Sequence, residues 1–216
     1  QSTNFTTPES IDLHHILKVM KNGGINHVPM EVSSHAIEMY RVENIMFNIG
    51  VFTNLGIDHL DFHGTQKNYF ESKLKLFKKL NENSTAIINI DDSYFKRISN
   101  SIKCKILSYG FNNKASIYIK KYSLSLENTS ATISYKNIDY SFKTPLIGKF
   151  NLYNLLASIA CSIKIGINIK NAIESSATFN HVPGRFEKFK LPKNKGYAIV
   201  DYAHSPDAYE NIFTNI

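Results

Sequence analysis

The sequence is poor in cysteine, and this scarcity limits the kinds of site that it can build. Only Cys104 and Cys161 occur among the 216 residues, and they lie far apart without a Cys-x-x-Cys spacing. A disulfide framework or a zinc site is therefore not expected, and both side chains are predicted to be small buried hydrophobes in a reducing compartment.

The sequence also lacks any long apolar run. A membrane-spanning helix needs roughly 18–20 apolar residues, and no segment approaches that length. The opening stretch "QSTNFTTPES" has neither the basic nor the apolar segment of a signal peptide. We therefore expect a cytoplasmic protein without a membrane partner.

Arginine is scarce as well, although the chain is basic. The formal charge is +7, from 25 Lys and Arg against 18 Asp and Glu, but only three residues are arginines and the lysines are scattered. Nucleic-acid binding normally needs a dense basic patch. The charge pattern favours a small anionic ligand over DNA or RNA.

What is present is an alternation of strand and helix patterns. Strands are predicted at "INHVPMEV" (25–32), "FNIGVFTNL" (47–55) and "STAIINI" (84–90). Between and before them, helices are predicted at "IDLHHILKVM" (11–20), capped by Thr7 with Pro8 at the first helical position, and at "QKNYFESKLKLFKKLN" (66–81). Asp91 and Asp92 are predicted to cap a helix over "SYFKRIS". This alternation predicts an α/β fold with a mostly parallel sheet flanked by helices.

The second half of the chain follows a different pattern. From about residue 104 to 146 the side chains alternate in period two, with a hairpin turn at Lys136-Asn137, which predicts a small antiparallel sheet attached to the main one. Two helices are expected over 151–166 and 168–177. A Pro- and Lys-rich connector then precedes a new strand-turn-helix unit, so we predict a domain boundary near residue 190.

Polar side chains gather after two of the predicted strands. Glu31, Ser33, His35 and Arg41 come after the "NHVPM" run of the first, and "DHLDFH" (58–63) follows the second. Ligands of parallel α/β sheets bind at the carboxyl ends of strands, so these groups are expected to share one crevice. Oxygen ligands would suit Mg²⁺, whereas the imidazoles could serve a transition-metal hydrolase, and capping loop residues are the third interpretation.

Five ordered motifs resemble one known family. "MEVSSHAIEMYRV", "VFTNLGIDHLDFHGTQKNYFESKLKLF", "GKFNLYNLLA", "VPGRFE" and "VDYAHSPDA" are similar to the Mur ligases of peptidoglycan synthesis, above all to their UDP-N-acetylmuramoyl-tripeptide synthetase branch. The resemblance covers nearly the whole chain. It implies an ATP- and Mg²⁺-dependent ligase that joins a diamino acid (meso-diaminopimelate or L-lysine) to UDP-MurNAc-L-Ala-D-Glu through an acyl phosphate.

The resemblance also implies roles for individual residues. Glu31, His59 and a carbamylated Lys73 would hold the metal and form the catalytic centre; without the resemblance, Lys73 would be taken for a solvated helix lysine. The substrate-contact positions are Thr6, Thr7, Ser33 and Arg41. The nucleotide positions are Asn151, Asn154, Arg185 and Asp201, of which Asn151 is also a candidate helix cap. The role of His204, in the same motif as Asp201, stays open.

This sequence departs from the family pattern in three places. The family often has Asn directly before the Thr-Thr pair and Gln two residues before the arginine, where this chain has Phe5 and Met39. The family's glycine-rich loop with Lys and Ser or Thr, which would surround ATP phosphates, does not occur.

The missing glycine-rich loop predicts a fragment. Residues 1–190 are expected to be most of the family's central ATP-binding domain without its P-loop segment, and residues 191–216 the start of a Rossmann-like C-terminal domain. We expect the fragment to be inactive alone and the full-length protein to be a monomer. A noncatalytic nucleotide-binding module is the remaining alternative.

Overall fold

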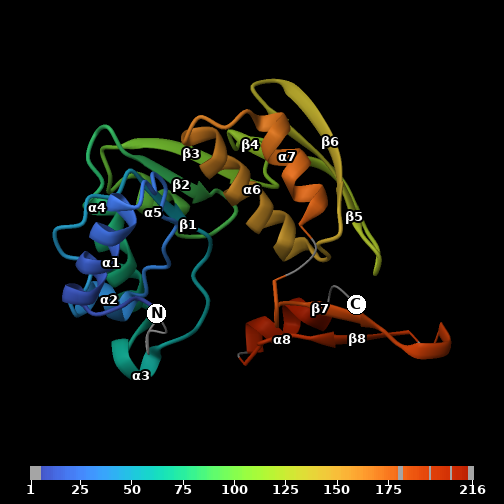
Figure 1. Ribbon diagram of the computed structural model, residues 1–216, viewed down its shortest axis with the longest axis horizontal. Coiled ribbons are helices and arrows are strands. Elements are labelled where there is room, and N and C mark those ends of the chain that lie inside the picture. The colour runs from blue at the N-terminus through green and yellow to red at the C-terminus, as the bar shows by residue number, and fades with distance from the viewer. Residues whose placement is uncertain (1–5, 180–181, 195, 205, 214–216) are drawn as a thin grey trace.

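One six-stranded sheet organises the structure. The computed structural model describes residues 6–179, 182–194, 196–204 and 206–213. The strand order is β1-β2-β3-β4-β5-β6, so neighbours in sequence are neighbours in the sheet (Figure 1). The strands are β1 (Ile49–Phe52), β2 (Thr85–Asn89), β3 (Lys105–Gly110), β4 (Ile117–Leu124), β5 (Thr129–Tyr135) and β6 (Ile138–Thr144).

The first four strands are parallel and the last three form an antiparallel extension. The pairs β1–β2, β2–β3 and β3–β4 run parallel, whereas β4–β5 and β5–β6 run antiparallel. The β5–β6 hairpin turns at Lys136 and Asn137, which both have positive φ (51° and 62°). Two such residues form the tight turn whose twist matches that of a hairpin. The predicted α/β class, antiparallel extension and hairpin turn are confirmed.

Helices cover both faces of this sheet. One face packs against α6 (Lys149–Lys164) and α7 (Ile169–Thr178), around a core that includes Ile87, Tyr109, Ile117, Ile133, Leu152 and Leu156. The other face packs against α4 (Gln66–Lys78) and α5 (Phe95–Ser99), around a core that includes Phe52, Phe70, Phe77, Ile88 and Ile98. Strand β2 is buried along its whole length because it lies between both layers.

Three further helices lie near α4 at the β1 end of the sheet. They are α1 (Ser10–Asn22), α2 (Ser34–Glu38) and α3 (Leu60–His63), and a small cluster of Leu13, Ile37 and Val42 packs α1 and α2 together. The prediction that Thr7 caps α1, with Pro8 at its first position, is wrong. The N-cap is Glu9, without a side-chain hydrogen bond, because the Thr7 hydroxyl is engaged elsewhere.

The predicted strand over 25–32 is also wrong. This segment has no regular structure, and residues 21–29 are exposed. A strand needs a hydrogen-bonding neighbour and at least one buried face, and the apolar pattern of "INHVPMEV" meets neither condition here. Glu31 therefore lies in an irregular segment, while the second predicted strand contains β1.

The last part of the described chain forms a separate small sheet. Strand β7 (Glu187–Lys190) pairs antiparallel with β8 (Tyr197–Val200), with a short 3₁₀ turn η1 (Pro192–Asn194) between them and α8 (Pro206–Phe213) after them. The boundary predicted near residue 190 thus falls between two paired strands. No helix in the part of the chain that the structure describes is long and apolar enough to cross a membrane.

Candidate functional site

Helix α2 lies against α4, and this contact brings the "MEVSSHAIEMYR" segment to the helix that carries Lys73. The Ser72 hydroxyl donates a hydrogen bond to the Ser34 carbonyl oxygen at 3.1 Å. One turn further along, the Lys75 ammonium pairs with the Glu38 carboxylate at 2.7 Å. Side chains from two distant stretches of sequence therefore share one site beside β1.

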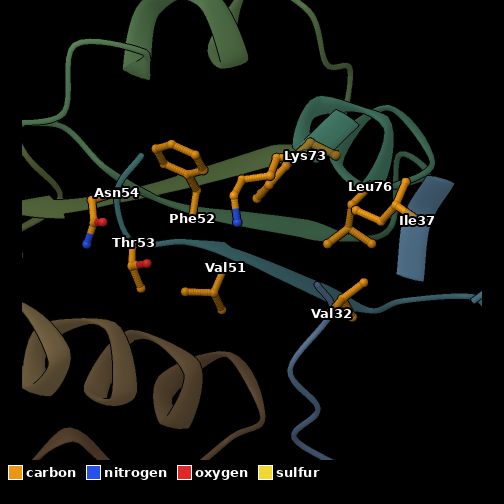
Figure 2. Close-up of a pocket in the computed structure, with 9 residues that line it drawn as sticks. Val32, Ile37, Val51, Phe52, Thr53, Asn54, Lys73 and Leu76 are labelled. Atoms are coloured by element: carbon orange, nitrogen blue, oxygen red, sulfur yellow. The ribbon is translucent and has the colours of Figure 1, made fainter. Parts of the chain in front are cut away.

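Lys73 reaches from α4 toward the carboxyl end of β1. It lines a cavity of about 60 Å³ together with Val51, Phe52, Thr53 and Asn54, and its amine points toward this stretch of the strand (Figure 2). A volume of this size exceeds the roughly 10–15 Å³ that one water molecule needs. The interpretation of Lys73 as an ordinary solvated lysine does not match this placement.

The surroundings of Lys73 lower its pKa. Burial is the largest cause, because it penalises the charged ammonium, and the carboxylates of Glu31 and Asp58 act in the opposite direction. These two acids come from the segments before α2 and before α3. Their influence at the lysine shows that Glu31 and Lys73, which lie 42 positions apart, share one electrostatic environment.

The ring of Tyr69 lies between Lys73 and His59. The Lys73 amine sits over this ring, 4.9 Å from its centroid, and the His59 ring makes a T-shaped contact with it, with 5.7 Å between the ring centroids. Tyr69 is buried, and burial raises its pKa to about 12. Sequence analysis missed this residue; its position one helical turn before Lys73 was the available signal. The structure therefore gathers Glu31, His59 and Lys73 in one region.

A cluster of imidazoles adjoins this region. The His35 ring lies 5.0 Å from that of His59 and 5.7 Å from that of His63. The Nε2 atom of His63 is 2.9 Å from the Ser34 hydroxyl, and burial, followed by the charge of His35, lowers the His63 pKa. Among the residues described, no group of three or more His, Cys, Asp or Glu side chains is arranged to hold a metal ion.

Three of the predicted substrate contacts form one buried network, with Thr7 at its centre. The Thr7 hydroxyl donates to the Glu31 carbonyl oxygen at 2.9 Å and accepts from the Ser33 amide at 3.3 Å. Ser33 itself caps α2 by accepting from the Ala36 amide. Thr7 therefore fixes the backbone on both sides of Val32, directly after Glu31, whereas Thr6 is exposed.

Arg41, which follows the C-terminal end of α2, also bonds to Thr7. Its guanidinium pairs with the Glu9 carboxylate at 2.7 Å and donates to the Thr7 carbonyl oxygen at 3.3 Å, with only 8% of the side chain exposed. The same guanidinium also donates to the sulfur of Met39 at 3.3 Å. Arg41 is thus engaged inside the protein in this structure. The other departure from the family pattern, Phe5, lies outside the described residues.

Replacing Thr7 by valine is expected to lower the free energy of unfolding by about 1–3 kcal/mol. Valine has nearly the same shape, but it leaves the Ser33 amide without its hydroxyl acceptor in a buried position. Urea unfolding of the two proteins measures the difference. Thr6→Val is the control, and its exposed position should keep the change within about 0.5 kcal/mol. Equal effects of both variants would contradict the bridging role of Thr7.

The predicted nucleotide residues on α6 lie at its first turns. The Asn151 side chain donates to the Ile147 carbonyl oxygen at 2.7 Å, and the Asn154 amide lies 3.4 Å from the Asn151 oxygen. The prediction that Asn151 caps the helix is wrong, since Gly148 is the N-cap. Asn154 is exposed and Asn151 half-buried, on the same side of the helix.

Arg185 and Asp201 belong to the small β7–β8 unit. The Asp201 carboxylate accepts from the Phe186 and Ala203 amides at 2.7 and 2.8 Å, which ties the turn before β7 to the end of β8. The exposed Arg185 guanidinium stacks over the Tyr202 ring at 5.0 Å. His204 lies against the same ring, and its Nδ1 is 2.9 Å from the Tyr202 carbonyl oxygen.

One aromatic contact connects these two groups. The Phe150 ring, next to Asn151 on α6, meets the ring of Phe186, next to Arg185, at 5.6 Å. The first turns of α6 and the turn before β7, which carry side chains predicted to contact the nucleotide, therefore lie next to each other. Asparagine amides, an arginine and an acid are groups that can bind a base, a phosphate and a ribose hydroxyl.

Comparison with known proteins places the chain among ligases. Residues 1–162 match the family model described as Mur ligase middle domain. The chain is 41% identical over 210 residues to the UDP-N-acetylmuramoyl-L-alanyl-D-glutamate--2,6-diaminopimelate ligase of Fusobacterium nucleatum and 37% identical over 221 residues to that of Geobacter metallireducens. These alignments cover 96% and 98% of the chain, but 42% of each relative.

Solved structures give the same result for the fold. A ligase structure of the same name superposes with a TM-score of 0.82 at 28% identity, covering 96% of this chain and 43% of the other. The Thermotoga maritima MurF ligase in complex with ADP superposes with a TM-score of 0.70 at 23% identity, covering 84% and 40%. The family match and the level of identity together show that this chain belongs to the Mur ligase family.

Proposed function

We propose that the chain is part of a cytoplasmic ligase of peptidoglycan synthesis that joins a diamino acid to UDP-MurNAc-L-Ala-D-Glu with the use of ATP and Mg²⁺. The names of the relatives support 2,6-diaminopimelate as the added amino acid. The chain spans about 42% of their length, so activity is proposed for a longer protein and not for these residues alone.

The observation that carries the proposal is the placement of Lys73. CO₂ adds to a neutral amine: the Nζ lone pair forms the new N–C bond and a proton leaves to water. Burial lowers the Lys73 pKa and so increases the neutral fraction, while Glu31 and Asp58 lie close enough to influence that pKa. A carbamate at this position would replace a buried cation by anionic oxygens.

Two of the three proposed ligands, the Glu31 carboxylate and a Lys73 carbamate, fit Mg²⁺ in their chemistry because they offer oxygen atoms. Glu31, His59 and carbamylated Lys73 would hold the ion, which prefers oxygen ligands and keeps water molecules in its shell. The bound ion would supply neutralisation of phosphate charge. An unmodified Lys73 would repel it. The donor set is therefore complete only once the amine carries CO₂.

ATP would be held by the residues at the start of α6 and in the β7–β8 unit. Asn151 and Asn154 offer amide groups to the base, and Arg185 and Asp201 offer a phosphate and a ribose contact. Bound ATP would supply the phosphoryl group that activates the D-glutamate carboxylate. In the substrate, an anionic group could pair with Arg41 only by replacing Glu9, while the exposed Thr6 hydroxyl is directly available.

The domain division is part of the same proposal. Residues 1 to about 186 would form most of the central domain, and β7, β8 and α8 would open the next one. Their exposed apolar side chains, which include Phe189, Val200 and Phe213, support this division, because a single strand pair and helix cannot bury their own faces.

A reconstituted assay tests the function. The natural protein that contains this chain is incubated with UDP-MurNAc-L-Ala-D-Glu, Mg²⁺ and ATP, and ADP release is followed after addition of diaminopimelate or lysine. We expect release that requires both the dipeptide substrate and one diamino acid. ATP hydrolysis that needs neither the dipeptide substrate nor a diamino acid would contradict the ligase proposal. Metal-dependent hydrolysis of the dipeptide substrate without ATP would favour the hydrolase.

A further inference from the structure

Two adjacent acids after β2 hold the ends of the two neighbouring strands. Asp92 bonds to the segment that follows β1, and Asp91 bonds to the segment that follows β3. Strand β2 lies between β1 and β3, so its carboxyl end can reach both sides. The prediction that these acids cap the following helix is wrong, because the N-cap of α5 is Tyr94, without a side-chain cap bond. Asp92 accepts from the Tyr94 amide at 2.8 Å just before α5, but this local contact is only part of what the pair does.

The end of β1 and the segment after it are held at three points. The Leu55 amide donates to the Asp92 carboxylate at 3.1 Å, and the Asn89 side-chain amide donates to the Thr53 carbonyl oxygen at 2.9 Å. The Tyr109 hydroxyl, from β3, donates to the Phe52 carbonyl oxygen at 3.2 Å. Asn89 is only 6% exposed, and its oxygen accepts from the Asp91 amide at 3.0 Å, so both ends of this amide are used.

This held segment leads into the site around Lys73. Thr53 and Asn54 line the Lys73 cavity, and Asp58 influences the Lys73 pKa. His59 follows directly, in a left-handed conformation with φ of 54°, which for a residue other than glycine needs support from its surroundings. A shift of the backbone at Leu55 would therefore move the groups that face the lysine.

We propose that Asn89 and Asp92 are positioning residues that hold the β1–α3 connection, residues 53–59, in place beside Lys73. Neither side chain needs to touch a substrate or a metal for this role. Asp92 accepts from two backbone amides at once, that of Leu55 in this connection and that of Tyr94 in the β2–α5 connection. Such bonds to a carboxylate are stronger than those to a neutral acceptor. The consequence for Mg²⁺ binding rests on the proposed function, whereas the positioning itself does not.

Asp91 supplies the matched control because it has the same charge and neighbours Asp92 in sequence. Its carboxylate accepts from the Phe111 amide at 2.5 Å, from the Asn112 amide at 3.1 Å and from the Tyr153 hydroxyl at 3.0 Å. A Cβ atom on Gly110 would lie 2.5 Å from its oxygen, so glycine is required for this approach. All these contacts lie on the β3 and α6 side, away from residues 53–59.

The test compares Asp92→Asn with Asp91→Asn in the full chain by NMR. The amide signal of Leu55 and the ring signals of His59 should shift in Asp92→Asn and stay in place in Asp91→Asn, where the Phe111 amide should shift instead. Asn89→Ala, which removes the bond to Thr53 together with the bond from the Asp91 amide, should move the same His59 signals and serves if Asp92→Asn fails to fold. Unmoved His59 signals in both folded variants would overturn the inference.

A second measurement separates this inference from the proposed function. Mg²⁺ is titrated into the bicarbonate-treated chain while the His59 signals are followed, and we expect about 10–100-fold weaker binding in Asp92→Asn, as for other groups that orient ligands. Shifted signals with unchanged Mg²⁺ affinity would limit the two residues to structural support and overturn the positioning role at the metal. A wild-type chain that binds no Mg²⁺, with the mutant shifts intact, would count against the proposed function alone.

Discussion

Replacing Phe70 by alanine is expected to lower the free energy of unfolding by about 3–5 kcal/mol, a large part of the roughly 5–15 kcal/mol that holds a domain together. The Phe70 side chain is fully buried between α4 and the sheet. Its ring stacks on Tyr94 at 4.3 Å, and the Arg97 guanidinium covers it at 4.6 Å. Removal of the ring leaves a cavity that α4 and α5 cannot close without moving.

Urea unfolding followed by circular dichroism measures this loss. Phe189→Ala is the matched control, because the same side chain is removed from a position that is 49% exposed, and its effect should be within about 0.5 kcal/mol. A loss below about 1 kcal/mol for Phe70→Ala would mean that α4 does not pack on the sheet as described. The described position of Lys73 would then be wrong as well, since the same helix carries both residues.

The parts of the fold that sequence could predict are those fixed by local pattern. The helix around Lys73 shows an apolar stripe at helical spacing, and the fully buried β2 shows a continuous apolar run. The Lys136-Asn137 turn separates two alternating segments, so the hairpin register follows from the sequence. In each case a short window contains the whole signal.

The failed predictions depended on partners distant in sequence. Residues 25–32 have the composition of a strand, but no pattern in one segment says whether a neighbouring strand will pair with it. Thr7 precedes a helix and is a good capping residue by type, yet its hydroxyl bonds to backbone groups 24 and 26 positions away. Tertiary hydrogen bonds decided the role in place of local propensity.

The site shows the same division. Glu31, His59 and Lys73 could be named from the family resemblance, but the burial that lowers the pKa of Lys73 follows from the placement of α4 beside β1. Tyr69 and the Asn89–Asp92 pair carried no comparable signal. Asp92 was predicted as a helix cap, and only the structure shows its bond to Leu55, 37 positions away.

Burial of Lys73 also predicts how stability depends on pH. The folded pKa lies below the ordinary value of 10.5, so between these two values the unfolded chain binds more protons than the folded one. The free energy of unfolding is therefore expected to receive a contribution from Lys73 that increases as pH rises through this window. In Lys73→Met this contribution disappears.

Lys73→Met is expected to abolish carbamate formation at this site and to weaken Mg²⁺ binding by at least roughly 10–100-fold, the loss found when only a supporting group of a metal site is removed. A ¹³C carbamate signal after addition of labelled bicarbonate should be present in the wild-type chain and absent from the variant. The signal should strengthen as pH rises, because the neutral amine is the reacting form. Methionine is unbranched, one atom shorter and close to lysine in volume, so the loss would reflect the chemistry of the amine.

Lys75→Met controls for the removal of a lysine from the same helix. Lys75 is 53% exposed on its side chain and pairs only on the surface with Glu38, an interaction that contributes about 0–1 kcal/mol. Carbamate signal and Mg²⁺ affinity should stay at wild-type values. If Lys73→Met retained both as well, the buried amine would have no part in metal binding, and the ligase chemistry would have to be assigned to other residues. If the signal were lost while Mg²⁺ affinity remained, Glu31 and His59 would hold the ion without the lysine.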